Sequence, residues 1–339
     1  MQTVTPQQYL TDPAFQHHVL LDVRSPGEYQ TGKLPGARSL PLFSDPERAE
    51  VGTLYKQMSP DAALLRGLEI AGGKMRWLVE EARRLAPENK VVVHCWRGGQ
   101  RSGSVAWLLE RAGFDVTQLT GGYKATRAAI RQYFRQPEHD FRVLSGPTGS
   151  GKTEILLAMR HLGAHVVDLE GLAHHKGSAF GALGEAPQPS SEEFENLLYA
   201  ALRAIPAGET VWLEDESRLI GHVYLTDEFY AALTAAPVVV VEQPLAWRVE
   251  RLVRQYAGYP KEGLAESFNK IRKRLGGQHL NAALAALERD DFATAAEVAL
   301  VYYDKAYHHY GERRGAAVLG TVVAAGREAE GVARQVLAV

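Results

Sequence analysis

The stretch VVVHCWRGGQRSGS, residues 91–104, contains Cys95, the single cysteine of a 339-residue chain. Three valines lead into it and predict a short buried strand, and the glycines, arginines and serines that follow predict a loop. The next segment, SVAWLLERAGF (104–114), has apolar residues at helical spacing. A strand, a loop and a helix in this order put Cys95 at the carboxyl end of a strand, where α/β folds bind ligands.

The segments around this stretch extend the same pattern. HHVLLDVRS (17–25) and DVTQLTGG (115–122) each predict a strand that ends in a turn, so the region is expected to form a parallel α/β sheet. Farther along, the chain becomes polar and contains a proline. We therefore expect a first domain over residues 1–127, a linker over 128–140 and a second domain over 141–339.

The second domain repeats the alternation of strands and helices. FRVLSG (141–146) predicts a strand, and TEILLAMRHLG (153–163) predicts the helix after it. Further elements are predicted at HVVDLEG (165–171), FENLLYAALRAI (194–205), ETVWLEDES (209–217) and APVVVVEQP (236–244), of which the second is a helix and the others are strands. The chain after about residue 245 predicts basic helices, and the final segment, 315–339, is apolar enough to pack but indicates no function.

The composition is that of an ordinary soluble globular protein, with 45% hydrophobic residues, 23% charged residues and a formal net charge of −2. One cysteine excludes an intrachain disulfide and a cysteine-based zinc site, and it fits a reducing compartment. The first residues lack the pattern of a signal peptide, and no apolar run approaches the ~18–20 residues that span a bilayer. We expect a cytoplasmic protein without a membrane partner.

The loop after the cysteine strand has features that favour an anion. A thiolate is the reactive form of cysteine, and the free thiol has a pKa of about 8.5. Consecutive glycine N–H groups, the positive end of the next helix and two arginines would stabilise a thiolate or hold selenophosphate or thiosulfate. Cys95 is the candidate nucleophile, and the candidate anion loop comprises Arg97, Gly98, Gly99, Gln100, Arg101 and Ser102. The alternative is that Cys95 is a small buried apolar residue.

Three segments of the first domain resemble the rhodanese family: LLDVRSPGEYQTGKLPGARSLP (20–41), HCWRGGQRS (94–102) and TGGYKA (120–125). The resemblance implies a domain that handles sulfur or selenium, with Cys95 as its nucleophile. We expect Asp22 and Arg24 to be structural, because the turn after the strand needs a polar residue that bonds its own backbone. Without a second cysteine, a chalcogen carried by Cys95 has to pass to a substrate or to another thiol.

The second domain opens with SGPTGSGKTEIL (145–156), which contains the phosphate-loop pattern G-x-x-x-x-G-K-T between a predicted strand and a predicted helix. Backbone N–H groups, a lysine and a hydroxyl in this context bind phosphates, and Mg²⁺ can join at Thr153. The candidate phosphate-binding residues are Gly146, Thr148, Gly149, Ser150, Gly151, Lys152 and Thr153. Among Glu214, Asp215 and Glu216, we favour Asp215 as the acidic partner. The alternative for the loop is a glycine turn with an exposed lysine.

The region 245–280 carries a cluster of cations with tyrosines between them, a pattern that suits RNA phosphates and stacked bases. The candidate RNA contacts are Arg248, Arg251, Arg254, Lys270, Arg272, Lys273 and Arg274. The alternative is a solvated helix face. Adjacent histidines, as in His174–His175 and His308–His309, point in different directions on a helix, so we predict no metal-binding cluster of protein side chains.

Three segments of the second domain resemble the bacterial tRNA 2-selenouridine synthase family: DLEGLAHHKGSAFG (168–181), EDESRLIG (214–221) and VYYDKAYHHY (301–310). The chain departs from the family pattern at His174 and Lys176. The candidate substrate contacts in these segments are Glu170, His175, Ser178, Phe180 and Arg218. An alternative is that Glu170 and Arg218 simply pair inside the core.

The resemblance implies a rhodanese-like parallel-sheet domain followed by a P-loop NTPase-like α/β domain with a basic helical extension. It implies a transferase that geranylates wobble 2-thiouridine of tRNA with geranyl diphosphate and then replaces the geranylated sulfur with selenium from selenophosphate. No tightly bound cofactor is expected, and the enzyme that makes selenophosphate is a candidate partner. One alternative is a rhodanese–ATPase fusion that transfers sulfur to RNA or to a carrier protein. Another is a non-catalytic RNA-binding regulator.

Overall fold

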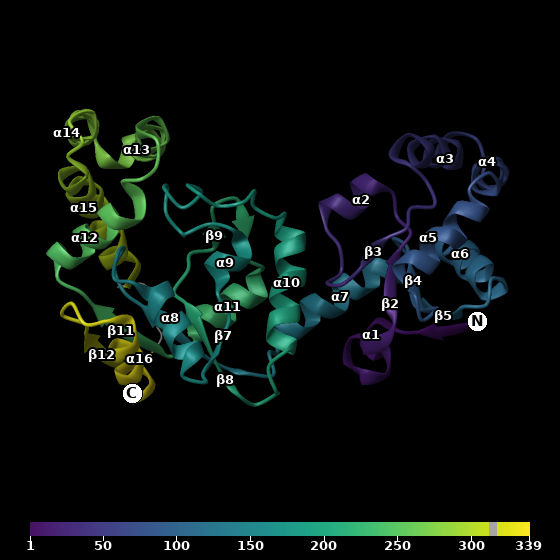
Figure 1. Cartoon of the computed structure of the whole chain (residues 1–339), viewed down its shortest axis with the longest axis horizontal. Helices are drawn as coiled ribbons and strands as arrows, with labels where there is room; N and C mark the ends of the chain where they lie inside the picture. Colours follow the sequence, from purple (N-terminus) through teal and green to yellow (C-terminus); the bar gives the residue numbers. More distant parts are fainter. Residues whose placement is uncertain (312–316) are drawn as a thin grey trace. The chain divides into compact units, whose positions relative to one another are not determined.

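The computed structural model describes residues 1–311 and 317–339 of the chain. The chain forms two compact units, Met1–Tyr133 and Phe134–Val339, and Figure 1 shows a sheet with helices around it in each. In the described part of the chain, no helix is both long enough and apolar enough to span a bilayer. Both units are α/β structures, as the alternating pattern predicts.

The sheet of unit 1 is entirely parallel and has the strand order β1-β5-β4-β2-β3. Its strands are β1 (Gln2–Val4), β2 (Val19–Asp22), β3 (Arg38–Ser39), β4 (Lys90–His94) and β5 (Asp115–Leu119). The valines of β4 are fully buried, because a central parallel strand is covered on both faces. Cys95 therefore follows the central strand at the carboxyl edge of the sheet.

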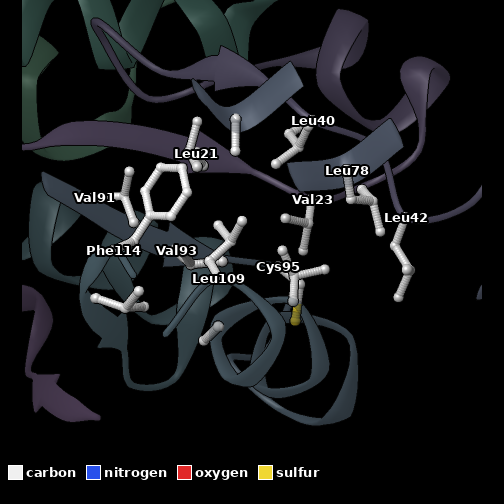
Figure 2. Close-up of a cluster of buried hydrophobic side chains, with 14 of the residues drawn as sticks. Leu21, Val23, Leu40, Leu42, Leu78, Val91, Val93, Cys95, Leu109 and Phe114 are labelled. Atoms are coloured by element: carbon white, nitrogen blue, oxygen red, sulfur yellow. The ribbon is translucent and has the colours of Figure 1, made fainter. Parts of the chain in front are cut away.

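The helices of unit 1 cover this sheet. They are α1 (Pro6–Thr11), α2 (Pro26–Thr31), α3 (Asp45–Gln57), α4 (Pro60–Gly72), α5 (Met75–Leu85), α6 (Gln100–Arg111) and α7 (Gly122–Arg135), with a 3₁₀ turn at Pro13–His17. Figure 2 shows Leu21, Val91, Val93 and Leu109 in their shared core. The expected linker, 128–140, corresponds to the last turns of α7 and the loop that leads to the next strand.

The sheet of unit 2 is also parallel, with the order β12-β11-β6-β8-β7. Its strands are β6 (Asp140–Ser145), β7 (His165–Val166), β8 (Thr210–Glu214), β11 (Val238–Glu242) and β12 (Val318–Val323), and a small hairpin is formed by β9 (Leu219–Ile220) and β10 (Val223–Tyr224). The expected strand over 165–171 was too long. The Asp168 side chain accepts a hydrogen bond from the Gly171 N–H at 2.6 Å and caps α9 (Leu169–Ala173), so the strand ends early.

The apolar C-terminal segment completes this sheet. Of the predicted region 315–339, the structure describes 317–339, and β12 pairs in parallel with β11. The following helix, α16 (Ala329–Leu337), packs its buried face on α8 (Lys152–His161). This segment therefore supplies an edge strand and a covering helix, which explains its apolar composition.

The remaining helices of unit 2 are α10 (Ser191–Arg203), α11 (Asp227–Ala235), α12 (Leu245–Tyr256), α13 (Lys261–Leu275), α14 (Gly277–Glu288) and α15 (Phe292–Gly311). Helices α12 to α15 gather in Figure 1 as a helical part of the unit. This part has its own core, in which Phe180 from the sheet side contacts Phe268 edge to face at 5.0 Å between ring centroids. The predicted helical extension is thus a packed layer that faces the loops of the sheet.

Candidate functional site

Cys95 is buried at the carboxyl end of β4, with 3% of its surface exposed. Its thiol donates a hydrogen bond to the Ser102 hydroxyl at 3.3 Å, and that hydroxyl donates to the Gly99 carbonyl at 3.1 Å. Figure 2 shows the sulfur at the margin of the apolar cluster, directed away from Val23. The thiol therefore sits between the core of unit 1 and the glycine loop, in contact with the first turn of α6.

Backbone contacts join the Cys95 loop to the TGGYKA segment. The Tyr123 and Lys124 N–H groups donate to the carbonyls of Cys95 and Trp96, both at 2.9 Å. Gly98 has a φ of +64°, and a Cβ built on it would lie 2.6 Å from the Leu119 carbonyl oxygen. Glycine is required at this position because the backbone is left-handed and the neighbouring backbone leaves no room for a side chain.

The two arginines of the loop differ in their surroundings. Arg97 is exposed. Arg101 pairs with Glu28 at 2.6 Å. Burial opposes ionisation of Glu28, but hydrogen bonds led by that of Arg101 outweigh it and lower the pKa of Glu28. The positive charge of Arg101 is therefore largely balanced by Glu28. The sequence analysis predicted that Arg101 binds an anion and did not foresee this pairing.

Asp22 and Arg24 are fully buried and form an ion pair at 2.6 Å. The Asp22 carboxylate also accepts a hydrogen bond from the Arg24 N–H at 3.0 Å, which is the local turn bond expected from the sequence. The Arg24 guanidinium lies 3.8 Å from the centre of the Tyr123 ring. These contacts hold the turn after β2 against the segment that closes the Cys95 loop.

Sequence reasoning missed Gln118. Its side-chain amide donates to the Gly98 carbonyl at 2.9 Å and to the Ser102 hydroxyl at 3.1 Å, so it supports both sides of the Cys95 loop. The available signal was its place near the end of β5, since β5 lies next to β4 and a polar side chain there can reach the neighbouring loop.

The phosphate loop connects β6 to α8 in unit 2. Lys152 is the first residue of α8, and its ammonium group donates to the Gly146 carbonyl at 2.9 Å. Gly149 and Gly151 have φ values of +81° and +85°. The backbone thus adopts the left-handed turns that only glycine takes easily, and the positive end of α8 faces the loop.

Acidic side chains gather beside this loop. Thr153 donates to Glu170 at 2.9 Å, and Ser145 donates to Asp215 at 2.5 Å. Glu170 and Glu216 share a hydrogen bond, and burial raises the pKa of both carboxyl groups. Of the three candidate acidic partners, Asp215 and Glu216 are among the described residues that line the adjoining cavity, and Glu214 is not.

A cavity of about 720 Å³ extends from the phosphate loop to the helical part of unit 2. Gly146, Thr148, Gly149, Gly151, Lys152 and Thr153 line its polar end. Its apolar wall includes Phe180, Tyr256, Leu264, Phe268, Leu287 and residues of α15. Ser150 is buried and is not among the described lining residues. The loop and α12 to α15 therefore enclose one space that suits a ligand with an anionic end and an apolar end.

The segment after α9 borders the same cavity. His175 is buried, its Nδ1 has no hydrogen-bond partner among the described residues, and burial lowers its pKa. The Tyr303 hydroxyl accepts the Ala179 N–H at 3.0 Å, which ties the segment to α15. Ser178 and Phe180 also line the cavity, so the structure brings these three predicted contacts together with Glu170.

Arg218 lies elsewhere. It pairs with Asp227 and stands 4.9 Å from the centre of the Tyr224 ring, and it is not among the described residues that line the cavity. The alternative in which Glu170 and Arg218 pair in the core is wrong, since Glu170 bonds to Thr153 and Arg218 bonds to Asp227. Arg218 therefore lies outside the cavity that the other predicted substrate contacts line.

The basic residues divide into two groups. Arg248 does not fit a tRNA contact, because it is 5% exposed, pairs with Asp304 and donates to the Thr148 carbonyl at 2.8 Å. Arg251 pairs with Glu154 and lines the cavity. The exposed members are Arg254, Lys270, Arg272, Lys273 and Arg274. Among the predicted tRNA contacts, the exposed members therefore remain available to an RNA surface, whereas Arg248 does not.

The described residues contain no group of three or more His, Cys, Asp or Glu side chains arranged to hold a metal ion. The side chains of the His308–His309 pair, and of the last residue of the segment 301–310, lie outside what the structure describes.

Comparisons with known proteins cover both units. A family model described as a rhodanese-like domain matches residues 5–129, and one described as the tRNA 2-selenouridine synthase AAA domain matches residues 139–330. A tRNA 2-selenouridine synthase of Shewanella loihica is 39% identical over 336 residues, which span 86% of this chain and 87% of that protein. Those of Shewanella sediminis and Salmonella arizonae are 35% and 37% identical, over 82% and 88% of this chain and 80% and 91% of the relatives.

Proposed function

The chain belongs to the tRNA 2-selenouridine synthase family, and we propose that it modifies one tRNA nucleoside in two steps. It is a tRNA-modifying transferase. In the first proposed step, geranyl diphosphate alkylates the sulfur of 2-thiouridine at the wobble position. In the second, selenium from selenophosphate replaces the geranylated sulfur, and 2-selenouridine results.

One observation carries the first step: the cavity of unit 2 joins a phosphate loop to an apolar wall. A prenyl diphosphate has the same two ends. Lys152 and the N–H groups at the start of α8 suit the diphosphate, and the side chains of α12 to α15 suit the isoprenoid chain. The wall consists mainly of phenylalanine, leucine, alanine and tyrosine, so it offers little to the ribose hydroxyls of a nucleotide.

The alkylation step forms a carbon–sulfur bond. The sulfur of 2-thiouridine attacks the first carbon of the geranyl chain, the carbon–oxygen bond breaks, and pyrophosphate leaves. The nucleoside loses its N–H proton as the thioether forms, and the proton passes to solvent or to the released pyrophosphate. Lys152 would stabilise the negative charge that grows on the diphosphate, and its fixed position means that little reorganisation is needed.

The selenium step then has a better leaving group. Selenium attacks the ring carbon, the carbon–sulfur bond breaks, and geranylthiol departs more readily than sulfide would. Hydrolysis of the selenium–phosphorus bond releases phosphate. We assign Cys95 to this step as the nucleophile that expels the thiol: its thiolate bonds to the ring carbon as geranylthiolate leaves and takes up a proton, and selenium then displaces the Cys95 thiolate from that carbon. We assign the exposed Arg97 to the attraction of the selenophosphate anion.

Mg²⁺ is also proposed to accompany the diphosphate. The Thr153 hydroxyl and the Glu170 carboxylate lie together beside Lys152, and such oxygen donors suit this ion. Thr153 and Glu170 would hold the ion, which would neutralise part of the diphosphate charge.

Mass spectrometry of nucleosides tests the assignment. Thiouridine-containing tRNA is incubated with the protein and with geranyl diphosphate, selenophosphate, both, or ATP alone. We expect a geranylated nucleoside with the first and selenouridine with both. Turnover of ATP or new sulfur incorporation, without either product, would instead favour a sulfurtransferase joined to an ATPase.

Two variants test the division of labour between the units. Cys95→Ala is expected to leave geranylation intact and to stop selenation, because the thiol lies in unit 1 and the cavity in unit 2. Lys152→Ala is expected to slow geranylation at least tenfold, and the exposed Lys305→Ala on α15 serves as its control. Loss of both steps in Cys95→Ala contradicts this division.

A further inference from the structure

One face of α15 forms a continuous side of the cavity in unit 2. Its lining residues fall on one side of the helix at positions three or four apart, in two places with a neighbour, and they are Phe292, Ala295, Ala296, Ala299, Tyr303, Ala306 and Tyr307. The face therefore follows the cavity lengthwise.

The C-terminal part of this face lies at the phosphate loop. The Tyr307 hydroxyl is 3.2 Å from the Ser145 hydroxyl, which directly precedes the loop. Asp304, one turn back, holds Arg248, whose guanidinium donates to the Thr148 carbonyl. Because a helix rises about 1.5 Å per residue, Ala299 lies about 12 Å from Tyr307 along the axis and Ala295 about 18 Å. Each residue of this face therefore lies at a set distance from the phosphate loop, and that distance increases from Tyr307 toward Phe292.

Small side chains leave the cavity open along that distance. Ala295 and Ala299 are buried, with 3% and 5% exposed, and they face the cavity where Leu264, Phe268 and Leu287 provide the rest of the wall. Phe292 is the first aromatic side chain of the face, at the end farthest from Tyr307. A larger residue at either alanine would fill the space that an apolar chain needs, since packed interiors have little spare volume.

A second observation points to the orientation of a ligand in this space. Lys152 and the glycines of the phosphate loop line one end of the cavity, and the apolar side chains of α13 to α15 line the rest. An anionic group is therefore expected at the loop, and an apolar chain attached to it has to extend along α15.

We propose that the α15 face sets the length of the prenyl chain that the cavity accepts, with Ala299 and Phe292 as the specificity-determining residues. The proposal rests on the proposed use of a prenyl diphosphate. The bond to the nucleoside sulfur forms as described for geranyl, and pyrophosphate leaves in each case. The chain runs from the phosphate loop along α15 toward Phe292, and each further isoprene unit needs more of that length.

The test compares dimethylallyl, geranyl and farnesyl diphosphates as alkyl donors for 2-thiouridine tRNA, with the alkylated nucleosides measured by mass spectrometry. Ala299→Phe is expected to lower the geranyl rate relative to the dimethylallyl rate at least tenfold. The matched control is Ala293→Phe, which puts the same side chain on the same helix at an exposed position outside the described cavity lining. The ratio of the geranyl rate to the dimethylallyl rate in Ala293→Phe is expected to stay within threefold of the ratio in the unmodified chain.

A second variant, which enlarges the cavity, keeps the test valid if Ala299→Phe fails to fold. Phe292→Ala enlarges the far end of the cavity and is expected to raise the farnesyl rate relative to the geranyl rate about tenfold. Unchanged ratios in both variants, with geranylation active in the unmodified chain, overturn the proposal. If the unmodified chain uses none of the three donors, the proposed function itself fails, so the two failures are distinct.

Discussion

Gly98→Ala gives the sharpest test of how the Cys95 loop is held. The new Cβ would lie 2.6, 2.7 and 2.8 Å from the Leu119 carbonyl oxygen and the N–H nitrogens of Gly121 and Gly122. These are backbone atoms, so no side chain can turn aside to make room. Either the Cys95 loop or the segment that closes it has to move.

The cost follows from two separate effects. A left-handed backbone costs an L-residue roughly 1–2 kcal/mol, and forcing one extra carbon into a packed site costs about 1–3 kcal/mol. We therefore expect a loss of about 2–5 kcal/mol. For a unit of 133 residues this corresponds to a fall in melting temperature of about 8–20 °C, at about 4 °C per kcal/mol.

Gly72→Ala is the matched control, since Gly72 lies in α4 outside the Cys95 loop, its φ is not in the left-handed region, and no described heavy atom lies within 4 Å of its ideal Cβ. Thermal unfolding by circular dichroism measures the stability of both variants. The rate of selenation of pre-geranylated tRNA reports on the function of the Cys95 loop. The rate of S-geranylation of 2-thiouridine tRNA reports on the function of unit 2. We expect Gly98→Ala alone to lose selenation at least tenfold while geranylation persists. Equal melting temperatures and equal selenation rates for the two variants would refute the reasoning.

Three further predictions concern unit 2. Burial, with nearby acidic groups, raises the pKa of Glu214 well above its usual range, so the folded state loses stability as pH rises above the unfolded value of about 4.3. Glu214→Gln should raise the melting temperature at pH 8, with a difference that narrows toward pH 5 in a pH series. Arg272→Ala and Lys273→Ala should each reduce the slope of log affinity for tRNA against log salt by about 1 in binding titrations, and an unchanged slope contradicts a phosphate contact. Arg248→Ala should leave that slope unchanged but destabilise the unit, toward the lower end of about 3–5 kcal/mol because its partner Asp304 is 33% exposed, as thermal unfolding can measure.

Local patterns predicted much of the fold. The run of valines before Cys95 forms β4, and the phosphate-loop pattern lies between β6 and α8 as its context indicated. These predictions succeed because a buried strand, a glycine turn and a helix start depend on neighbouring residues. The strand expected over 165–171 was too long for a similarly local reason, since the Asp168 cap was overlooked.

Burial and partners could not be predicted in the same way. Arg248 and Arg272 look alike as cations in the sequence, yet Arg248 is enclosed against Asp304 and Arg272 is exposed. The pairing of Arg101 with Glu28 joins positions far apart in the chain. Charge counting cannot distinguish such residues, because solvent access depends on segments distant in sequence.

The sequence by itself determined the two α/β units, the cysteine loop and the phosphate loop, because each is specified by short-range propensity and by glycines at fixed positions. Only the tertiary structure decided that a face of α15 and the phosphate loop line the same cavity. It also decided that Glu170 and Glu216 lie together beside Lys152, where burial raises the pKa of both carboxyl groups. The reason is physical: cavities and raised carboxyl pKa values arise from the packing of distant segments that exclude water, and no local pattern records that exclusion.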